Sequence, residues 1–211
     1  MGLRWKVAQA AEIRWWKKYL AKKDVDTYLN WKKKYWIDFL KKLNLQIPIG
    51  VTCLDAGCGP AGIFTVLDEQ TVTALDPLLD QYTQELDHFQ PEHYKNVTFI
   101  NTALEKFQPT QSYDYIFCLN AINHVNNLAQ SLDNLFQAGR KGTQIIISVD
   151  AHNYKGFKYL FKSLPGDILH PHQYDLKEYV NMLHQYNINI KDTILVKKEF
   201  FFAYYAIILE V

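Results

Sequence analysis

Residues 51–62 hold the pattern in this chain that is best suited to chemistry. A hydrophobic run reaches Asp55, and glycines follow at positions 57, 59 and 62 before a new apolar segment. This order predicts a strand that enters a helix through a turn, where glycine lets bare backbone approach a ligand because a Cβ would collide with it. The pattern indicates a nucleotide-type ligand, and the residues that follow must choose among such ligands.

Two carboxylates narrow that choice. Asp76 and Pro77 end a second short apolar run, twenty-one residues after Asp55, so Asp76 is placed to accept both hydroxyls of an adenosine ribose. Asp55 closes the first predicted strand, where the pyrophosphate of a dinucleotide would pass, and a carboxylate there repels phosphate. A ligand with a cation or an amino-acid head group fits better, which disfavours a nicotinamide-dependent oxidoreductase.

At these residues the chain resembles the class I S-adenosylmethionine-dependent methyltransferases, whose first motif is an acid followed by Gly-x-Gly. Residues 55–62 match that motif throughout, residues 97–105 resemble the third-strand motif that flanks adenine, and residues 113–125 resemble the fourth-strand motif. The resemblance covers about residues 50–150. It is nearest to small-molecule O-methyltransferases of the ubiquinone-biosynthesis type.

The resemblance implies S-adenosylmethionine as the cofactor. The glycine turn would hold its methionine moiety, the second strand its ribose, the third-strand motif its adenine and the fourth the surroundings of the sulfonium. The predicted cofactor-binding residues are Asp55, Ala56, Gly57, Cys58, Gly59, Asp76, Pro77, Thr102, Ala103 and Asn120. Two positions depart from the family: Thr102 stands where an acid is frequent, and Asn123 replaces the acid of an acid-His-Val triplet.

Methyl transfer is an in-line displacement, so holding acceptor and donor collinear supplies much of the catalysis. A hydroxyl acceptor also benefits from a base near neutral pH, and histidine suits that task. His124, after the fourth predicted strand, is the candidate catalytic base, with a structural or capping role as the alternative. For His170 and His172, which flank Pro171, substrate contact is favoured over metal binding. No metal site is predicted.

Residues 1–47 differ from the rest of the chain, because they hold all five tryptophans and twelve Lys or Arg against four Asp or Glu. Helices are predicted over 4–22 and 25–43, with Asp24 as the N-cap of the second. These helices would cover the mouth of the cofactor cleft. The alternative is a surface for an acidic substrate, an anionic membrane or nucleic acid.

Lys34, Tyr35 and Trp36 lie about twenty residues before Asp55, where related enzymes contact the methionine end, and Trp36 is predicted to contact substrate. A second aromatic stretch, 150–175, would help to roof the cleft and exclude water. An aromatic roof favours a small, partly apolar acceptor, although core packing explains the same aromatic residues equally well.

The alternation of apolar runs with helical patterns predicts an α/β fold. Its sheet would be doubly wound, mostly parallel, seven-stranded and Rossmann-like, with an antiparallel C-terminal hairpin that adds one edge strand. A helical cap over 1–47 would pack on a methyltransferase domain over 48–211, and the two would form one structural unit. Strands are expected at 51–55, 71–75, 97–101, 113–118, 143–149, 187–197 and 200–209, and helices at 61–68, 78–88, 125–138 and 174–185.

Composition limits the class of protein. The 211 residues are 48% hydrophobic, enough for a full core, and no apolar run approaches the roughly 20 residues of a membrane span. With no signal-like N-terminus and three cysteines interpreted as reduced thiols, a cytoplasmic enzyme is expected, and its oligomeric state is left open. The predicted function is methyl transfer to a small-molecule hydroxyl. The alternatives are an RNA or protein methyltransferase and a catalytically silent cofactor-binding scaffold.

Overall fold

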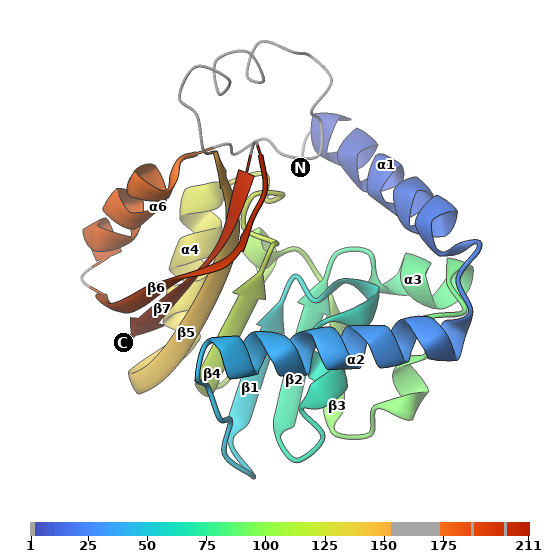
Figure 1. Cartoon of the computed structure of the whole chain (residues 1–211), viewed down its shortest axis with the longest axis horizontal. Helices are drawn as coiled ribbons and strands as arrows, with labels where there is room; N and C mark the ends of the chain where they lie inside the picture. The colour runs from blue at the N-terminus through green and yellow to red at the C-terminus, as the bar shows by residue number, and fades with distance from the viewer. Residues whose placement is uncertain (1–2, 153–173, 187, 201) are drawn as a thin grey trace.

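The apolar runs between residues 51 and 210 become strands because each is short, rich in Val, Ile and Phe, and ended by a turn signal. The computed structural model describes residues 3–152, 174–186, 188–200 and 202–211, and there the strands form one sheet in the order β3-β2-β1-β4-β5-β7-β6 (Figure 1). The strands are β1 (Thr52–Ala56), β2 (Thr71–Asp76), β3 (Val97–Asn101), β4 (Tyr113–Leu119), β5 (Gly139–His152), β6 (Asn189–Lys198) and β7 (Phe202–Glu210).

The first five strands pair in parallel, and β7 pairs antiparallel with both β5 and β6. The predicted seven-stranded, doubly wound fold with a C-terminal hairpin is therefore confirmed. The hairpin also supplies the expected antiparallel edge strand, since β6 takes the edge and β7 lies one place inside it. The reason is burial: β7 carries the apolar run and is largely buried, whereas β6 has many exposed residues.

Alternate strand residues build a hydrophobic core on each face of the sheet. On one face, Cys53 and Phe117 pack in a core shared with the N-terminal helices. On the other face, Leu54 and Ile116 pack with the helices that follow β4 and precede β6. The helices are α1 (Leu3–Leu20), α2 (Val25–Lys42), α3 (Leu79–Glu85), α4 (Leu128–Gln137) and α6 (Leu176–Leu183).

The predicted helix over 61–68 is wrong. Two short 3-10 helices, Gly59–Ala61 and Ile63–Val66, occupy this segment instead. Gly62 between them is extended, and the Phe64 N–H donates to the buried carboxylate of Asp55 at 3.1 Å rather than to a helical carbonyl. The extended backbone of Gly62 interrupts the segment and prevents one continuous helix.

The N-terminal helices pack directly on the sheet, as a helical cap requires. Ile13, Leu20 and Phe39 belong to the same core as the strand residues of that face, and Figure 1 shows α2 running across the front of the sheet. The predicted N-cap of α2 is confirmed, because Asp24 Oδ1 accepts from the Thr27 N–H at 2.9 Å.

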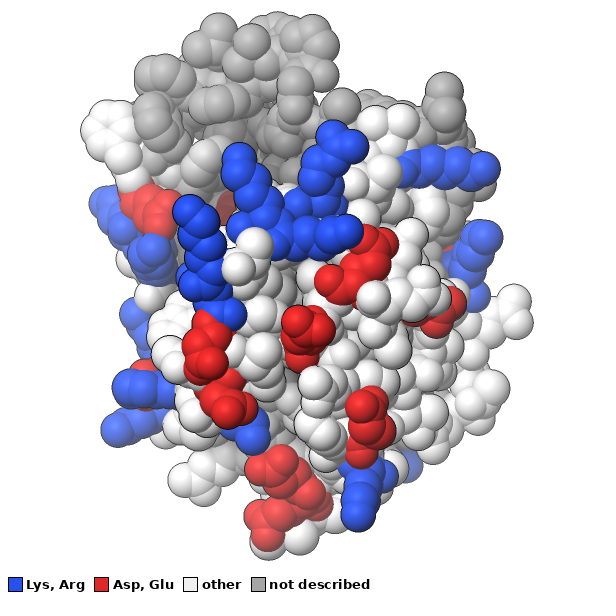
Figure 2. Space-filling view, turned by 90° about the vertical axis from the view of Figure 1, so that its right-hand side faces the viewer, with Lys and Arg blue, Asp and Glu red and all other residues white. Residues whose placement is uncertain are grey.

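The positive charge of the N-terminal segment is carried largely on the surface. Lys and Arg side chains gather across the upper part of the face in Figure 2, toward α1, and Asp and Glu lie below them. The exposed basic residues of α1 include Lys6, Arg14, Lys17 and Lys18. Of the helices that the structure describes, none combines the length and apolar character that crossing a bilayer demands.

Candidate active site

A cavity of about 760 Å³ opens at the carboxyl ends of β1, β2, β4 and β5. The chain reverses its strand order between β1 and β4, and ligands of doubly wound sheets bind at this point. The structure brings most of the predicted site residues together around this cavity. The predicted residues that line it are Trp36, Ala56, Gly57, Cys58, Gly59, Asp76, Pro77, Ala103, Asn120 and His124.

Four predicted site residues do not appear in that lining. Asp55 is buried behind the turn, and Thr102 lies beside the cavity with its hydroxyl 3.5 Å from the Ala103 carbonyl oxygen. His170 and His172 lie outside the described residues, as does most of the 150–175 stretch expected to roof the cleft.

The glycine turn after β1 is shaped mainly by the protein itself. Gly57 and Gly59 have φ of +77° and +58°, a region that disfavours residues with a side chain. A Cβ on Gly57 would lie 2.3 Å from the Ala121 Cβ, and one on Gly62 would lie 2.4 Å from Asp55 Oδ2. The expectation that the excluded Cβ would meet ligand is therefore corrected, since at positions 57 and 62 it would meet protein atoms.

Asp55 stabilises the turn from beneath. Its carboxylate accepts from the Phe64 N–H, and Lys32 contributes a favourable charge interaction. Burial raises the pKa of Asp55 to about 7, and the Phe64 hydrogen bond opposes this shift. The carboxylate thus organises the loop that borders the cavity.

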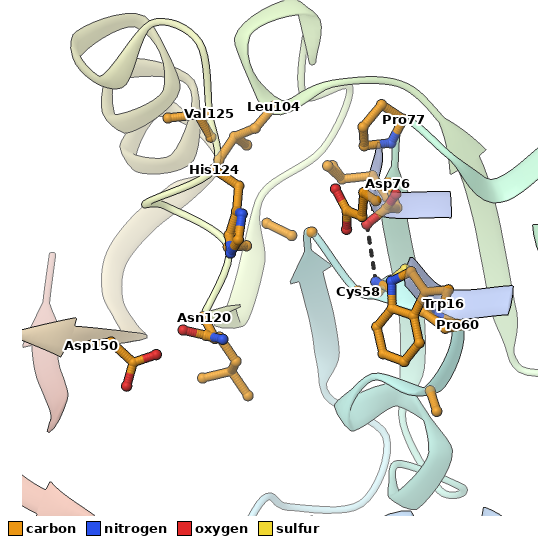
Figure 3. Close-up of a pocket in the computed structure, with 18 of the residues that line it drawn as sticks. Trp16, Cys58, Pro60, Asp76, Pro77, Leu104, Asn120, His124, Val125 and Asp150 are labelled. Carbon is orange, nitrogen blue, oxygen red and sulfur yellow. Dashed lines mark hydrogen bonds between the residues drawn. The ribbon is translucent and has the colours of Figure 1, made fainter. Parts of the chain in front are cut away.

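Asp76 presents its carboxylate to the cavity from the end of β2. Oδ2 accepts from the Gly59 N–H at 3.0 Å, the bond dashed in Figure 3, and Oδ1 accepts from the Leu78 N–H at 2.9 Å. Burial, followed by the charge of Glu12, raises the pKa of Asp76 to about 7. Each carboxylate oxygen has a second lone pair, so Asp76 can also accept hydrogen bonds from a ligand.

A second group of polar side chains lies on the side of the cavity opposite Asp76. In Figure 3, Asn120, His124 and Asp150 lie across the cavity from Asp76, Cys58 and Trp16. Asn120 has a φ of +53°, and its N–H donates to Ser148 Oγ at 2.9 Å and to the Ser148 carbonyl at 3.2 Å. These bonds from β5 hold the turn after β4 in a conformation that side-chain-bearing residues adopt at a cost.

A hydroxyl chain extends from this turn toward α2. Ser148 Oγ lies 2.6 Å from the Tyr204 hydroxyl, and the Tyr35 hydroxyl is close enough to Tyr204 for the two phenols to influence each other's pKa. Tyr35 and Tyr204 both line the cavity. The two phenols therefore supply polar groups on a wall that is otherwise aromatic.

Helix α2 contributes the residues on the third side. Trp36 is buried and donates from Nε1 to the Ala61 carbonyl at 2.9 Å, so it ties α2 to the glycine turn as well as lining the cavity. Lys34 points elsewhere and forms an exposed ion pair with Asp38 at 2.8 Å. Lys34 does not line the cavity, whereas Lys32 does, because it shares a helical face with Tyr35 and Trp36.

Lys32 was missed by the sequence reasoning. Its ammonium lies 4.5 Å from the centre of the Trp36 ring and 5.1 Å from that of Tyr35, so aromatic faces stabilise its charge. Burial lowers the pKa of Lys32 to about 8, an effect that Asp55 opposes. Other missed cavity residues are Glu12, Trp16, Asp150 and Tyr204. Helical spacing was the signal available for Glu12, Trp16 and Lys32.

Comparisons with known proteins agree with this geometry. A family profile described as a methyltransferase domain matches residues 28–192. The ubiquinone biosynthesis O-methyltransferase of Rickettsia felis is 31% identical over 106 residues, which cover 49% of this chain and 43% of that protein. The chain therefore matches less than half the length of this curated relative.

Two solved structures share the fold. The N-methyltransferase NodS from Bradyrhizobium japonicum WM9 superposes with a TM-score of 0.62 at 11% identity, over 86% of this chain and 97% of that one. The magnesium protoporphyrin IX methyltransferase from Synechocystis PCC 6803, solved with bound SAH, gives 0.58 at 18% identity, over 90% and 87%. Together with the family match over most of the chain, the glycine turn and Asp76 show that this protein belongs to the class I S-adenosylmethionine-dependent methyltransferases.

Proposed function

We propose that this enzyme transfers the methyl group of S-adenosylmethionine to a hydroxyl of a small, partly apolar molecule. The observation that carries the proposal is one cavity with two polar sides, Asp76 and the glycine turn on one and His124 with Asp150 on the other (Figure 3). The relatives in ubiquinone biosynthesis, which are named as O-methyltransferases, support a hydroxyl acceptor.

The residues on the Asp76 side fit the cofactor. Asp76 would accept the ribose hydroxyls, Pro77, Ala103 and Leu104 offer apolar contact for the adenine, and the turn at Gly57 would border the methionine moiety. Thr102 does not line the cavity and would support cofactor binding through the backbone beside Ala103. Asp55 would support it indirectly, by holding the glycine turn in place. The cofactor supplies an electrophilic methyl group on a sulfonium, and the chain's contribution is to orient both reactants and exclude water.

The residues on the other side suit an acceptor hydroxyl. His124 would take the hydroxyl proton, while Asn120 would lie beside the sulfonium and hold the geometry of the turn. Trp36, Tyr35 and Tyr204 would enclose the apolar part of the acceptor. Aromatic side chains combined with convergent polar groups are typical of sites for small molecules.

Asp76→Ala should weaken S-adenosylhomocysteine binding by about 2 to 3 kcal/mol, the scale for hydrogen bonds to a charged acceptor. Calorimetry measures the effect. Asp80→Ala is the matched control, because Asp80 is exposed on the following helix and does not line the cavity. Equal affinities for wild type and Asp76→Ala would show that the ribose is bound elsewhere.

The acceptor is tested by incubating the enzyme with radiolabelled S-adenosylmethionine and matched acceptors. A catechol and a simple phenol are compared with an aromatic amine of the same size. Labelled methyl ether from the phenolic compounds is the expected result. Label found only in the amine product would contradict a hydroxyl acceptor while leaving the cofactor site intact.

RNA or protein is the alternative acceptor class, suggested by the exposed basic residues of α1 and α2 (Figure 2). Binding of a nucleic acid through several phosphates weakens steeply as salt increases. Methylation of RNA that falls steeply between low and physiological salt would support this alternative. Labelled small-molecule product with little salt dependence would support the main proposal.

A further inference from the structure

One face of α1 turns into the cavity beside Asp76. Trp5, Gln9, Glu12 and Trp16 all line the cavity, and their spacing of four, three and four residues places them on a single helical stripe. The opposite side of the helix carries the exposed basic residues Arg14 and Lys18. The face of α1 that lines the cavity therefore carries two polar side chains, Gln9 and Glu12, between Trp5 and Trp16.

Glu12 lies beside Asp76 and two aromatic side chains. The Tyr82 hydroxyl lies 3.5 Å from Glu12 Oε1, and the Trp16 side chain stabilises the charged form of Glu12, which opposes the rise in its pKa. Tyr82 also stabilises the charged form of Asp76. A carboxylate can accept about four hydrogen bonds, so both acids can accept further bonds from a ligand.

Among the ion pairs found in the described ranges, none involves Glu12 or Asp76, and no group of three metal-ligating side chains occurs there. Burial raises the pKa of Glu12, and burial together with Glu12 raises that of Asp76. Two neighbouring carboxylates repel anions and favour a ligand that donates several hydrogen bonds or carries positive charge.

Gln9 provides an independent sign that this stripe faces a ligand. Its Oε1 atom is buried and has no hydrogen-bond partner within the part of the chain that the structure describes. Buried polar atoms of this kind are rare without a partner, and Gln9 lies one turn before Glu12 on the cavity side.

We propose that Glu12 is a further cofactor-binding residue, which with Asp76 forms a two-carboxylate site for the vicinal ribose hydroxyls. The inference rests on the cofactor site proposed above. It makes α1 a component of the binding site, so the N-terminal helix discriminates for a ribose that keeps both hydroxyls. A diol has two donors and no charge, which matches two acceptors that repel anions.

Calorimetry with S-adenosylhomocysteine tests the proposal on wild type, Glu12→Gln and Glu85→Gln. Glu12→Gln should weaken binding about tenfold, whereas Glu85→Gln, which removes only the exposed Lys17–Glu85 ion pair between α1 and α3, should leave it unchanged. Melting temperatures of the three proteins establish that each is folded. Analogues of S-adenosylhomocysteine that lack the 2′ or the 3′ hydroxyl complete the test. The analogue that lacks the hydroxyl bound by Glu12 should bind wild type and Glu12→Gln with equal affinity.

If Glu12 only repels Asp76 and does not contact the ribose, Glu12→Gln will bind S-adenosylhomocysteine as tightly as wild type or more tightly, and the proposal fails. A wild-type protein that binds no S-adenosylhomocysteine would instead refute the proposed cofactor site itself. The two failures are therefore distinguishable.

The pH dependence gives a second readout. Asp76 faces Glu12 from α1, Tyr82 from α3, and Cys58 and Asp55 from β1 and its turn. Protonation weakens a carboxylate as an acceptor, so affinity should rise about tenfold from pH 6 to pH 8 and then level off. In Glu12→Gln the rise should move to lower pH, because a charge that raises the pKa of Asp76 is gone. An identical pH profile in both proteins would contradict the coupling.

Discussion

His124→Gln is expected to lower kcat about 100-fold or more on a phenolic acceptor, the lower end of the general-base contribution. His124 lines the cavity on the loop after β4, opposite Asp76, and its backbone N–H donates to the Ala121 carbonyl at 3.0 Å. Glutamine keeps the size and polarity of the side chain but cannot take a proton near neutral pH. Affinity for S-adenosylhomocysteine should change by less than about twofold, since the proton transfer occurs on the acceptor.

Two controls separate a base from a structural role. Raising the pH toward the acceptor's own pKa should narrow the difference between wild type and His124→Gln, because the phenol then ionises in solution. Imidazole added to His124→Ala should restore part of the lost rate. A deficit that stays constant with pH and resists imidazole would assign His124 to loop structure.

Gly57→Ala is expected to lower the free energy of unfolding by about 2 to 5 kcal/mol, combining left-handed backbone strain with overpacking. The added Cβ would lie 2.3 Å from the Ala121 Cβ, so the turn after β1 and the loop after β4 cannot both keep their positions. Urea denaturation measures the loss. Loss of S-adenosylhomocysteine binding should accompany it, since both segments line the cavity.

Gly50→Ala is the matched control. Gly50 has the same φ of +77°, but a Cβ there meets nothing within 4 Å. It should cost only the strain, about 1 to 2 kcal/mol. If the two variants lose equal stability, the contact with Ala121 does not determine the need for glycine at position 57.

The sequence predicts the fold and the Asp76 end of the site because both depend on local patterns. A strand, a glycine turn and an acid at the end of the next strand lie within 26 residues, and parallel topology brings Gly59 and Asp76 together. The predictions from sequence are wrong where contacts between segments far apart in the chain determine the local structure or the orientation of a helix. Gly62 takes an extended conformation that divides the segment expected as a helix over 61–68 into two short 3-10 helices.

The cap residues show the same limit. The position of Lys34 before Asp55 predicts a place near the site, but the rotation of α2 turns Lys32 toward the cavity and leaves Lys34 exposed. Glu12 and Asp76 are 64 residues apart, and only the docking of α1 beside α3 makes them neighbours. Helical periodicity gives the faces of each helix, but not which face meets the cavity.

A crystal structure with S-adenosylhomocysteine would show whether the cavity is the cofactor site. The ribose hydroxyls are expected within hydrogen-bonding distance of the Asp76 carboxylate, the adenine beside Pro77 and Ala103, and the sulfur facing Asn120 and His124. A nucleoside bound away from the glycine turn, or no binding at a saturating concentration, would contradict this site.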